Sequence, residues 1–117
     1  MVEVSLADPA EVMASIWSSI DGGVTAPNGF EAAGVVAGLK PSGLPDLALI
    51  LAPEDAVCAG TFTTSVVRAA CVDLCAERLS SRDGRTRAVL INSGQANACT
   101  GDRGLLDSQR ATQAVAD

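Results

Sequence analysis

The stretch TRAVLINSGQANACTGDRG, residues 86–104, joins an apolar run to a segment rich in glycine, amide and hydroxyl side chains. The apolar residues of TRAVLIN are nearly continuous, which predicts a strand over residues 86–92 that is buried on both faces. Helical character resumes in LLDSQRATQAVAD, residues 105–117. With the elements predicted below, the chain has the order helix, strands, helix, strand, helix, which predicts a mixed α/β layered domain. The turn is either a structural connection or a site whose backbone N–H groups face an anion.

The preceding residues predict further elements of the same domain. Residues 31–37 and 47–51 are predicted strands that form a hairpin through the turn signals of residues 38–46. Residues 57–62, rich in β-branched side chains and glycine, predict a third strand. A helix is predicted over residues 69–79. Its apolar face is formed by Val72, Cys75, Ala76 and Leu79.

The amino-terminal residues carry a helix signature of their own. Asp8 is a suitable N-cap, and Pro9 is a suitable first helical residue. Apolar side chains follow at helical spacing, at Met13, Ile16, Trp17 and Ile20. We expect residues 1–21 to form an amphipathic helical extension and residues 22–117 to form the α/β domain.

Charge and composition exclude several classes of partner. The chain has 117 residues, a formal net charge of −6 and only 3% aromatic residues. It therefore lacks the basic surface and the stacking side chains that nucleic acids or anionic membranes require. The first residues do not resemble a secretory signal, and no apolar stretch approaches the ~20 residues that span a bilayer. We expect one cytoplasmic domain that binds a small molecule or another protein.

The chain contains no histidine, and this limits its chemistry. Neither a Ser-His nor a Cys-His catalytic pair can be assembled from it. The four cysteines are Cys58, Cys71, Cys75 and Cys99, of which only Cys71 and Cys75 are close in sequence. We expect no metal or cofactor site, and reduced thiols that pack as small buried hydrophobes.

The glycine-rich turn does not match the phosphate-binding spacings. GQANACTG is not followed by the Lys-Ser/Thr pair of a P-loop, and Gly94, Gly101 and Gly104 do not follow the dinucleotide-binding interval. What remains is a strand-to-helix turn in which the hydroxyl of Thr100 stands beside the N–H of Gly101. This pair suits a small oxyanion, and a purely structural turn is the alternative.

Three longer segments carry a resemblance to a known family. They are GGVTAPNGFEAAGVVAGLKPSGLPDLALILA, AVCAGTFTTSVVRAA and RAVLINSGQANACTGDRGLLD. Together they resemble the amino-terminal part of the bifunctional ornithine acetyltransferase and N-acetylglutamate synthase family of arginine biosynthesis. The likeness runs from about Gly22 to the end of the sequence, and its most specific pieces are GVTAPNGF, GTFTT and NSGQANACTG.

The resemblance implies an N-terminal-nucleophile-like αββα sandwich and a precursor that cleaves itself before a threonine. The α-chain and β-chain so formed stay together, and the new terminal threonine moves the acetyl group from N-acetylornithine to glutamate. No cofactor enters this cycle, and the α-amine of the threonine can act as base. Thr100 and Gly101 correspond to the family's oxyanion hole. Asn92, Asn97 and Cys99 match the same motif and are interpreted as turn-shaping and packing residues.

Asp117, the last residue, precedes the family's cleavage motif and its threonine nucleophile. We therefore expect this α-chain fragment to be inactive by itself and to need the rest of the α-chain and the β-chain as partners. Two other hypotheses remain open: a non-catalytic α/β interaction module, and a fragment of a self-processing aminopeptidase or amidase of the same architecture.

Overall fold

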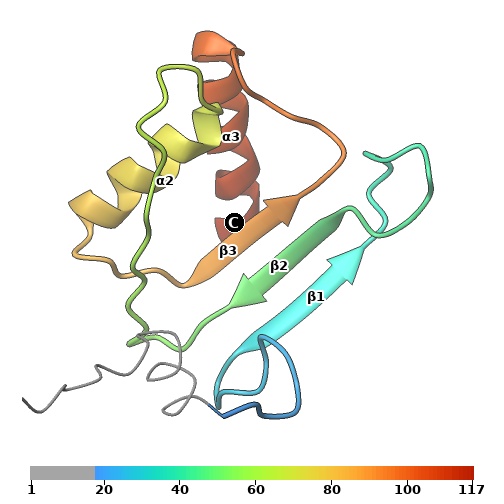
Figure 1. The fold of residues 1–117 in the computed structure, drawn as a ribbon, viewed down its shortest axis with the longest axis vertical. Coiled ribbons are helices and arrows are strands. Elements are labelled where there is room, and N and C mark those ends of the chain that lie inside the picture. Colours follow the sequence, from blue (N-terminus) through green and yellow to red (C-terminus); the bar gives the residue numbers. More distant parts are fainter. Residues whose placement is uncertain (1–17) are drawn as a thin grey trace, which may run out of the picture.

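Residues 18–117 are described by a computed structural model. Their three strands are β1 (Glu31–Val35), β2 (Leu47–Leu51) and β3 (Ala88–Asn92), which form one sheet in the order β1-β2-β3 (Figure 1). Both pairings are antiparallel, with Glu31 opposite Leu51 and Leu47 opposite Asn92. The predicted hairpin of β1 and β2 is confirmed. β1 ends two residues earlier than predicted because the N–H of Ala37 turns away to the carboxylate of Asp46.

Two helices lie beside this sheet, α2 (Ala70–Ser81) and α3 (Gly101–Ala116) (Figure 1). They pack against each other, and neither makes an extensive contact with a strand. The predicted helix over residues 69–79 is confirmed, but the inward residue Leu74 lies outside the predicted apolar face. The last helix begins four residues before its predicted start, at Gly101, so two of the three glycines assigned to the turn, Gly101 and Gly104, are helical.

The predicted strand over residues 57–62 is wrong. Val57 forms only an isolated bridge with Arg85, and the N–H of Cys58 donates to the carbonyl of Gly84 at 2.7 Å. Gly84 has a φ of +74°, and a Cβ there would lie 2.7 Å from the carbonyl oxygen of Cys58, so the two backbones meet at one point. Beyond it the chain leaves the sheet and runs past α2 (Figure 1).

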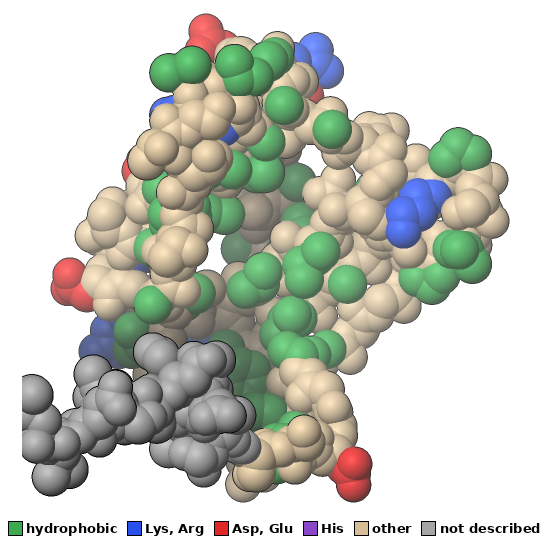
Figure 2. Space-filling view, viewed as in Figure 1, with side chains coloured by type: hydrophobic (Ala, Val, Ile, Leu, Met, Phe, Trp, Pro, Cys, Tyr) green, Lys and Arg blue, Asp and Glu red, His purple; other side chains and the backbone are tan. Residues whose placement is uncertain are grey.

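The predicted burial of β3 on both faces is also wrong for the described residues. Val89 is 44% exposed and Ile91 is 45% exposed. Figure 2 shows hydrophobic side chains gathered around the hollow between the sheet and the helices. Within residues 18–117, Leu74 is the only hydrophobic side chain that is buried. The sheet therefore presents apolar side chains that this part of the molecule does not cover.

The cysteines differ from the expected small buried hydrophobes. Cys71, Cys75 and Cys99 are exposed, Cys58 is half-buried, and none forms a disulfide. Cys71 and Cys75 lie on α2, which among the described helices and strands packs extensively only against α3, and Cys99 lies in the turn before α3.

The predicted amino-terminal helix lies outside the described residues, except for its expected end. Residues 18–20 have no regular structure. The division into residues 1–21 and 22–117 stays a prediction. None of the helices found between residues 18 and 117 combines the length and apolar character that a membrane crossing requires.

Candidate functional site

The turn that joins β3 to α3 places Thr100 and Gly101 at the amino terminus of α3. Thr100 is the N-cap residue and Gly101 is the first helical residue. The first N–H groups of a helix have no acceptor within it, and they lie at the positive end of the helix dipole. Within residues 18–117, the Gly101 N–H has no protein acceptor. The start of α3 therefore leaves one backbone donor free beside the Thr100 side chain.

The backbone on both sides of Thr100 has an uncommon shape. Cys99 has a φ of +58° and Gly101 a φ of +56°, whereas Thr100 between them has a φ of −92° and a ψ of −2°. Alternation of this kind directs successive N–H groups to one side and forms a concave anion-binding nest. The left-handed conformation costs a non-glycine residue such as Cys99 about 1–3 kcal/mol. The turn therefore holds its shape against a local cost.

The Thr100 hydroxyl points back into the turn. Its Oγ donates to the carbonyl oxygen of Asn97 at 2.6 Å. A hydroxyl carries a single proton, so this proton serves either Asn97 or an anion beside Gly101, not both. A neutral hydrogen bond contributes only about 1 kcal/mol, and a bond to a charged acceptor is stronger, so exchanging the Asn97 carbonyl for an oxyanion is favourable.

The side chain of Asn97 ties the turn to both helices. Its Nδ2 donates to Ser108 Oγ on α3 at 3.4 Å, and the Cys71 thiol on α2 donates to its Oδ1 at 3.6 Å. Ala98 forms an isolated bridge with Ala69, the residue before α2. These contacts fix the second half of the turn relative to the helix pair.

Gly104 allows the close approach of Thr100 and α2. It is buried, and a Cβ at this position would lie 1.8 Å from Thr100 Oγ and 3.3 Å from the Cβ of Ala70. Sequence reasoning treated this glycine only as a turn residue. Gly104 follows Thr100 by four residues, which is about one helical turn. This spacing indicates a contact between the two residues only once α3 is known to begin at Gly101.

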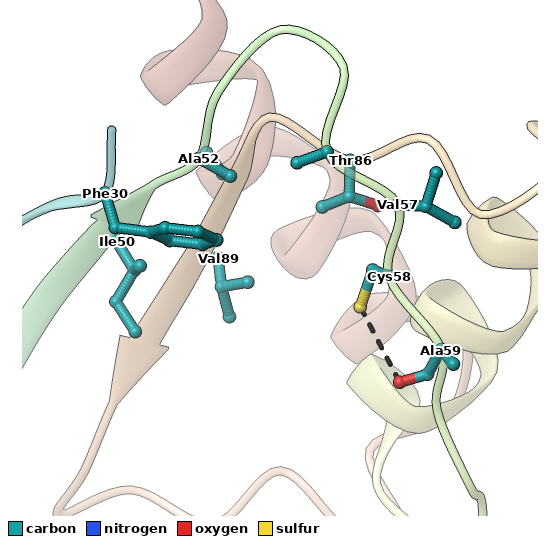
Figure 3. A pocket seen from close by; sticks show the side chains of 10 residues that line it. Phe30, Ile50, Ala52, Val57, Cys58, Ala59, Thr86 and Val89 are labelled. Carbon is teal, nitrogen blue, oxygen red and sulfur yellow. Dashed lines mark hydrogen bonds between the residues drawn. The ribbon is translucent and has the colours of Figure 1, made fainter. Parts of the chain in front are cut away.

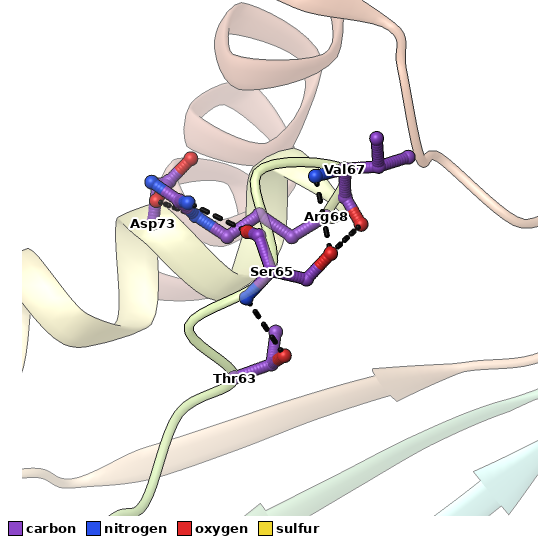
Figure 4. Close-up of polar contacts among 5 residues, drawn as sticks. All are labelled: Thr63, Ser65, Val67, Arg68 and Asp73. Atoms are coloured by element: carbon purple, nitrogen blue, oxygen red, sulfur yellow. Dashed lines mark hydrogen bonds and ion pairs between the residues drawn. The ribbon is translucent and has the colours of Figure 1, made fainter.

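The segment before α2 is organised by its own polar contacts (Figure 4). Ser65 Oγ accepts from the Val67 N–H at 3.2 Å and donates to the Val67 carbonyl at 3.0 Å. Arg68 donates to the Ser65 carbonyl at 2.8 Å and pairs with Asp73 at 2.6 Å. Exposed ion pairs contribute at most about 1 kcal/mol. The hydrogen bonds and the ion pair of this segment matter here for geometry. They shape the chain directly before α2, where Ala69 forms its bridge with the turn.

Asp46 is a residue that sequence reasoning missed. It is 3% exposed, and within the described residues it is the only polar or charged residue that is buried. The N–H groups of Ala37 and Lys40 hold the pKa of its carboxyl below the usual range, and the Leu39 N–H adds to this effect. Its own carbonyl accepts the Ser93 N–H at 2.9 Å. The sequence feature that could have identified it is its position, directly before an apolar strand and after a loop that contains glycine and proline.

A separate apolar cavity of about 290 Å³ lies at the other end of the sheet (Figure 3). Its lining includes Phe30, Ile50 and Val89, with Thr86 as its polar side chain. None of residues 92–104 lines it. The cavity suits an apolar group and is not part of the turn that carries Thr100.

Metal ligation has no support in the described residues. Between residues 18 and 117, no group of three or more Cys, Asp or Glu side chains is arranged to hold a metal ion. The donors that the turn offers are hydroxyl and N–H groups, which suit an oxyanion and not a cation.

Comparisons with known sequences agree on one family. The model of the ArgJ family matches residues 31–117. The chain is 72% identical, over all its 117 residues, to the arginine biosynthesis bifunctional protein ArgJ of Parasynechococcus marenigrum strain WH8102, of which it covers 28%. It is 69% identical over 107 residues, 92% of the chain, to the protein of that name in Prochlorococcus marinus strain MIT 9313, and covers 25% of it. The chain thus spans about a quarter of the length of these curated relatives.

Solved structures give the same result. The ornithine acetyltransferase of Mycobacterium tuberculosis, complexed with ornithine, matches with a TM-score of 0.71 and 52% identity, over 75% of this chain and 45% of that one. ArgJ from Bacillus halodurans matches with a TM-score of 0.70 and 38% identity, over 76% of this chain and 46% of that one. These likenesses confirm the predicted fold class, the N-terminal-nucleophile-like layered α/β fold of the ornithine acetyltransferases, of which the described sheet and helices are one part. On the match of sequence and fold together, the chain belongs to the ArgJ family.

Proposed function

We propose that this chain is part of the α-chain of a self-processing acetyltransferase that moves the acetyl group from N-acetylornithine to glutamate in arginine biosynthesis. The observation that carries the proposal is the likeness to the Mycobacterium tuberculosis ornithine acetyltransferase, whose solved structure holds ornithine. The two are 52% identical, and their folds match over three quarters of this chain.

The proposed reaction proceeds through an acyl-enzyme on the terminal threonine of the β-chain. The threonine hydroxyl attacks the acetyl carbonyl of N-acetylornithine, and its proton passes through the α-amine to the leaving nitrogen as the C–N bond breaks. The amine of glutamate then attacks the acetyl ester, which gives N-acetylglutamate and restores the hydroxyl. Both steps pass through a tetrahedral oxyanion, and the cycle uses no cofactor.

In this scheme Thr100 and Gly101 bind that oxyanion. Three observations support the assignment: the free Gly101 N–H, the start of α3 behind it, and the alternation of φ across Cys99, Thr100 and Gly101. The Thr100 hydroxyl joins them when it turns from the Asn97 carbonyl. Because the negative charge exists only in the transition state and intermediate, these donors act on the rate of reaction and not on substrate binding.

The partners in this proposal are the rest of the α-chain and the β-chain with the nucleophile, assembled as a hetero-oligomer in the cytoplasm. The uncovered apolar side chains of the sheet support this arrangement, because strands of this composition pack against further structure in layered folds. Residues 1–21 form the proposed amino-terminal extension and residues 22–117 the α-chain part of the α/β domain.

The test is acetyl transfer by the complete enzyme, with its α-chain and β-chain. Incubation with N-acetylornithine and glutamate, without acetyl-coenzyme A, is expected to give ornithine and N-acetylglutamate in equal amounts. Mass spectrometry of the β-chain after incubation with N-acetylornithine alone is expected to show one added acetyl group. Absence of transfer combined with cleavage of peptide or amide substrates would instead support the aminopeptidase or amidase hypothesis.

A further inference from the structure

The hairpin loop between β1 and β2 and the turn that carries Thr100 leave the same end of the sheet (Figure 1). β1 ends there, β2 begins there, and β3 ends there. Asp46, the residue before β2, lies between the two loops. Its side chain and its backbone each bind a different loop.

The carboxylate of Asp46 organises the hairpin loop. Its Oδ1 accepts the Ala37 N–H at 2.7 Å, and its Oδ2 accepts the N–H groups of Leu39 and Lys40 at 2.5 and 2.8 Å. Because an ionised carboxylate accepts hydrogen bonds with both oxygens, a single side chain can hold three backbone N–H groups. Charge-assisted bonds of this kind are stronger than neutral ones, so residues 37–40 are held in one conformation.

The backbone of Asp46 and the loop it holds make contact with the start of the other turn. The Ser93 N–H donates to the Asp46 carbonyl at 2.9 Å. At Gly94, φ is +99°, and a Cβ would lie 2.7 Å from Lys40 Cγ and 3.2 Å from the Leu39 carbonyl oxygen. The hairpin loop therefore fixes both the hydrogen bonding and the close packing of the residues that follow β3.

The turn is consequently anchored at two points. Ser93 and Gly94 are held by the hairpin loop, and Asn97 and Ala98 are held by the helix pair. Only residues 95 and 96 lie between the two anchors. A displacement of the first anchor is transmitted over this short link to Asn97, whose carbonyl holds the Thr100 hydroxyl.

We propose that Asp46 is a positioning residue for the acetyl transfer: by fixing Ser93 and Gly94 through the hairpin loop, it sets the position of the Thr100 hydroxyl. The inference rests on the proposed function, since it concerns the donors assigned to the oxyanion. Asp46 itself touches no substrate in this account.

The experiment is a double-mutant cycle in the complete enzyme, with Asp46→Asn, Thr100→Ala and the double variant. Asparagine keeps one acceptor but places an NH₂ group against backbone N–H donors, which loosens the loop. A misplacement of the order of 1 Å in a catalytic constellation costs up to about 10²-fold in rate, so Asp46→Asn is expected to lower kcat by about 10- to 100-fold with little change in KM. In the Thr100→Ala background the same substitution is expected to lower kcat by no more than about 2-fold, because the donor that it misplaces is already absent.

Gly94→Ala disturbs the same contact between the hairpin loop and the turn, but on the side of the turn. It provides a second test if the Asp46→Asn enzyme does not fold. It is expected to show the same dependence on Thr100. Asp55→Asn, an exposed carboxylate outside both loops, is the matched control and is expected to leave kcat unchanged. All rates are measured well below the thermal midpoint of each variant.

An equal loss of kcat with Thr100 present and in the Thr100→Ala background would overturn the inference, because Asp46 would then act only on stability or on the whole site. An unchanged kcat in both Asp46→Asn and Gly94→Ala would overturn it as well. Either result, obtained with a wild-type enzyme that transfers acetyl groups, leaves the proposed function standing. A wild-type enzyme without transfer activity would remove the proposed function first and this inference with it.

Discussion

At the scale of single residues, the site depends on where a side chain is absent as much as on where one is present. Thr100 supplies the hydroxyl, but its place is set by Gly104, one helical turn further on, where a Cβ would lie 1.8 Å from its Oγ. Cys99 takes a left-handed conformation that costs energy, and Gly101 takes the same conformation without that cost. The two glycines therefore have distinct steric reasons for their identity: Gly104 leaves room for Thr100, and Gly101 takes a left-handed conformation without strain.

Gly104→Ala in the complete enzyme is expected to lower both stability and turnover. Alanine gains about 1 kcal/mol in helix propensity. The overlap with Thr100 and the contact with Ala70 outweigh that gain, because overpacking costs about 1–3 kcal/mol and the Thr100 side chain must rotate away. We expect a lower thermal midpoint by circular dichroism and a kcat reduced by about 10-fold or more.

Gly23→Ala is the matched control, because a Cβ there would meet no atom within 4 Å. A Gly104→Ala enzyme with the kcat and thermal midpoint of wild type would show that Thr100 and Gly104 do not constrain each other.

At the scale of helices and strands, local sequence patterns predicted most elements. They failed where contacts between segments distant in sequence determine whether a strand forms. Apolar runs predicted β1, β2 and β3, and helical spacing predicted α2. Residues 57–62 have strand composition but lack a neighbouring strand among the described residues, and only Val57 finds a partner. Strand propensity shows that side chains would fit the surface of a sheet. It does not show whether a neighbouring strand is available for pairing.

The candidate site was predictable in part for the same reason. Thr100 and Gly101 are neighbours in sequence, so their proximity needs no fold. Asp46 is far from them in sequence, and its contact with Ser93 arises only when β2 pairs with β3. The sequence did not predict the exposure of Val89 and Ile91. A continuous apolar run indicates that a strand is covered, but it does not show which segment covers it.

Acid is expected to weaken the hairpin loop through Asp46. Hydrogen bonds from Ala37, Lys40 and Leu39 lower its pKa in the folded protein, so the folded state binds the proton less tightly than the unfolded state. The resulting stability is complete above the unfolded pKa of about 3.9 and is lost as the pH falls through the lower folded pKa. The thermal midpoint of the complete enzyme is therefore expected to fall more steeply between pH 7 and pH 2 in wild type than in the Asp46→Asn variant.

Asp55→Asn serves as the comparison for the loss of one exposed carboxyl group. If Asp46→Asn and wild type lose stability in parallel over this range, the carboxylate of Asp46 does not contribute in its ionised form.

At the scale of the whole molecule, the described residues form a sheet and a helix pair without a closed core. Leu74 is the only buried hydrophobic side chain within them, and large apolar side chains of all three strands remain exposed. The chain also covers only 28% and 25% of the two curated relatives. In the proposed enzyme, the remaining α-chain and the β-chain cover these surfaces and bring the nucleophile to Thr100.

The isolated chain of 117 residues is expected to self-associate and to have no acetyl-transfer activity. Exposed apolar strands and sheet edges pair with one another when their covering structure is absent. Sedimentation velocity over a series of concentrations is expected to show species larger than a monomer that grow with concentration, whereas the complete enzyme is expected to show one assembly. A monodisperse monomer at high concentration would favour the independent interaction module.

The most direct test of the account is the kinetic effect of Thr100→Ala and Thr100→Ser in the complete enzyme. Removal of one of two oxyanion donors is expected to lower kcat by about 10² to 10³-fold, or roughly 3 to 4 kcal/mol, with KM little changed. Thr100→Ser keeps the donor and is expected to retain most of the activity. A Thr100→Ala enzyme with the kcat of wild type, and only a lower thermal midpoint, would contradict the account and leave the turn a structural one.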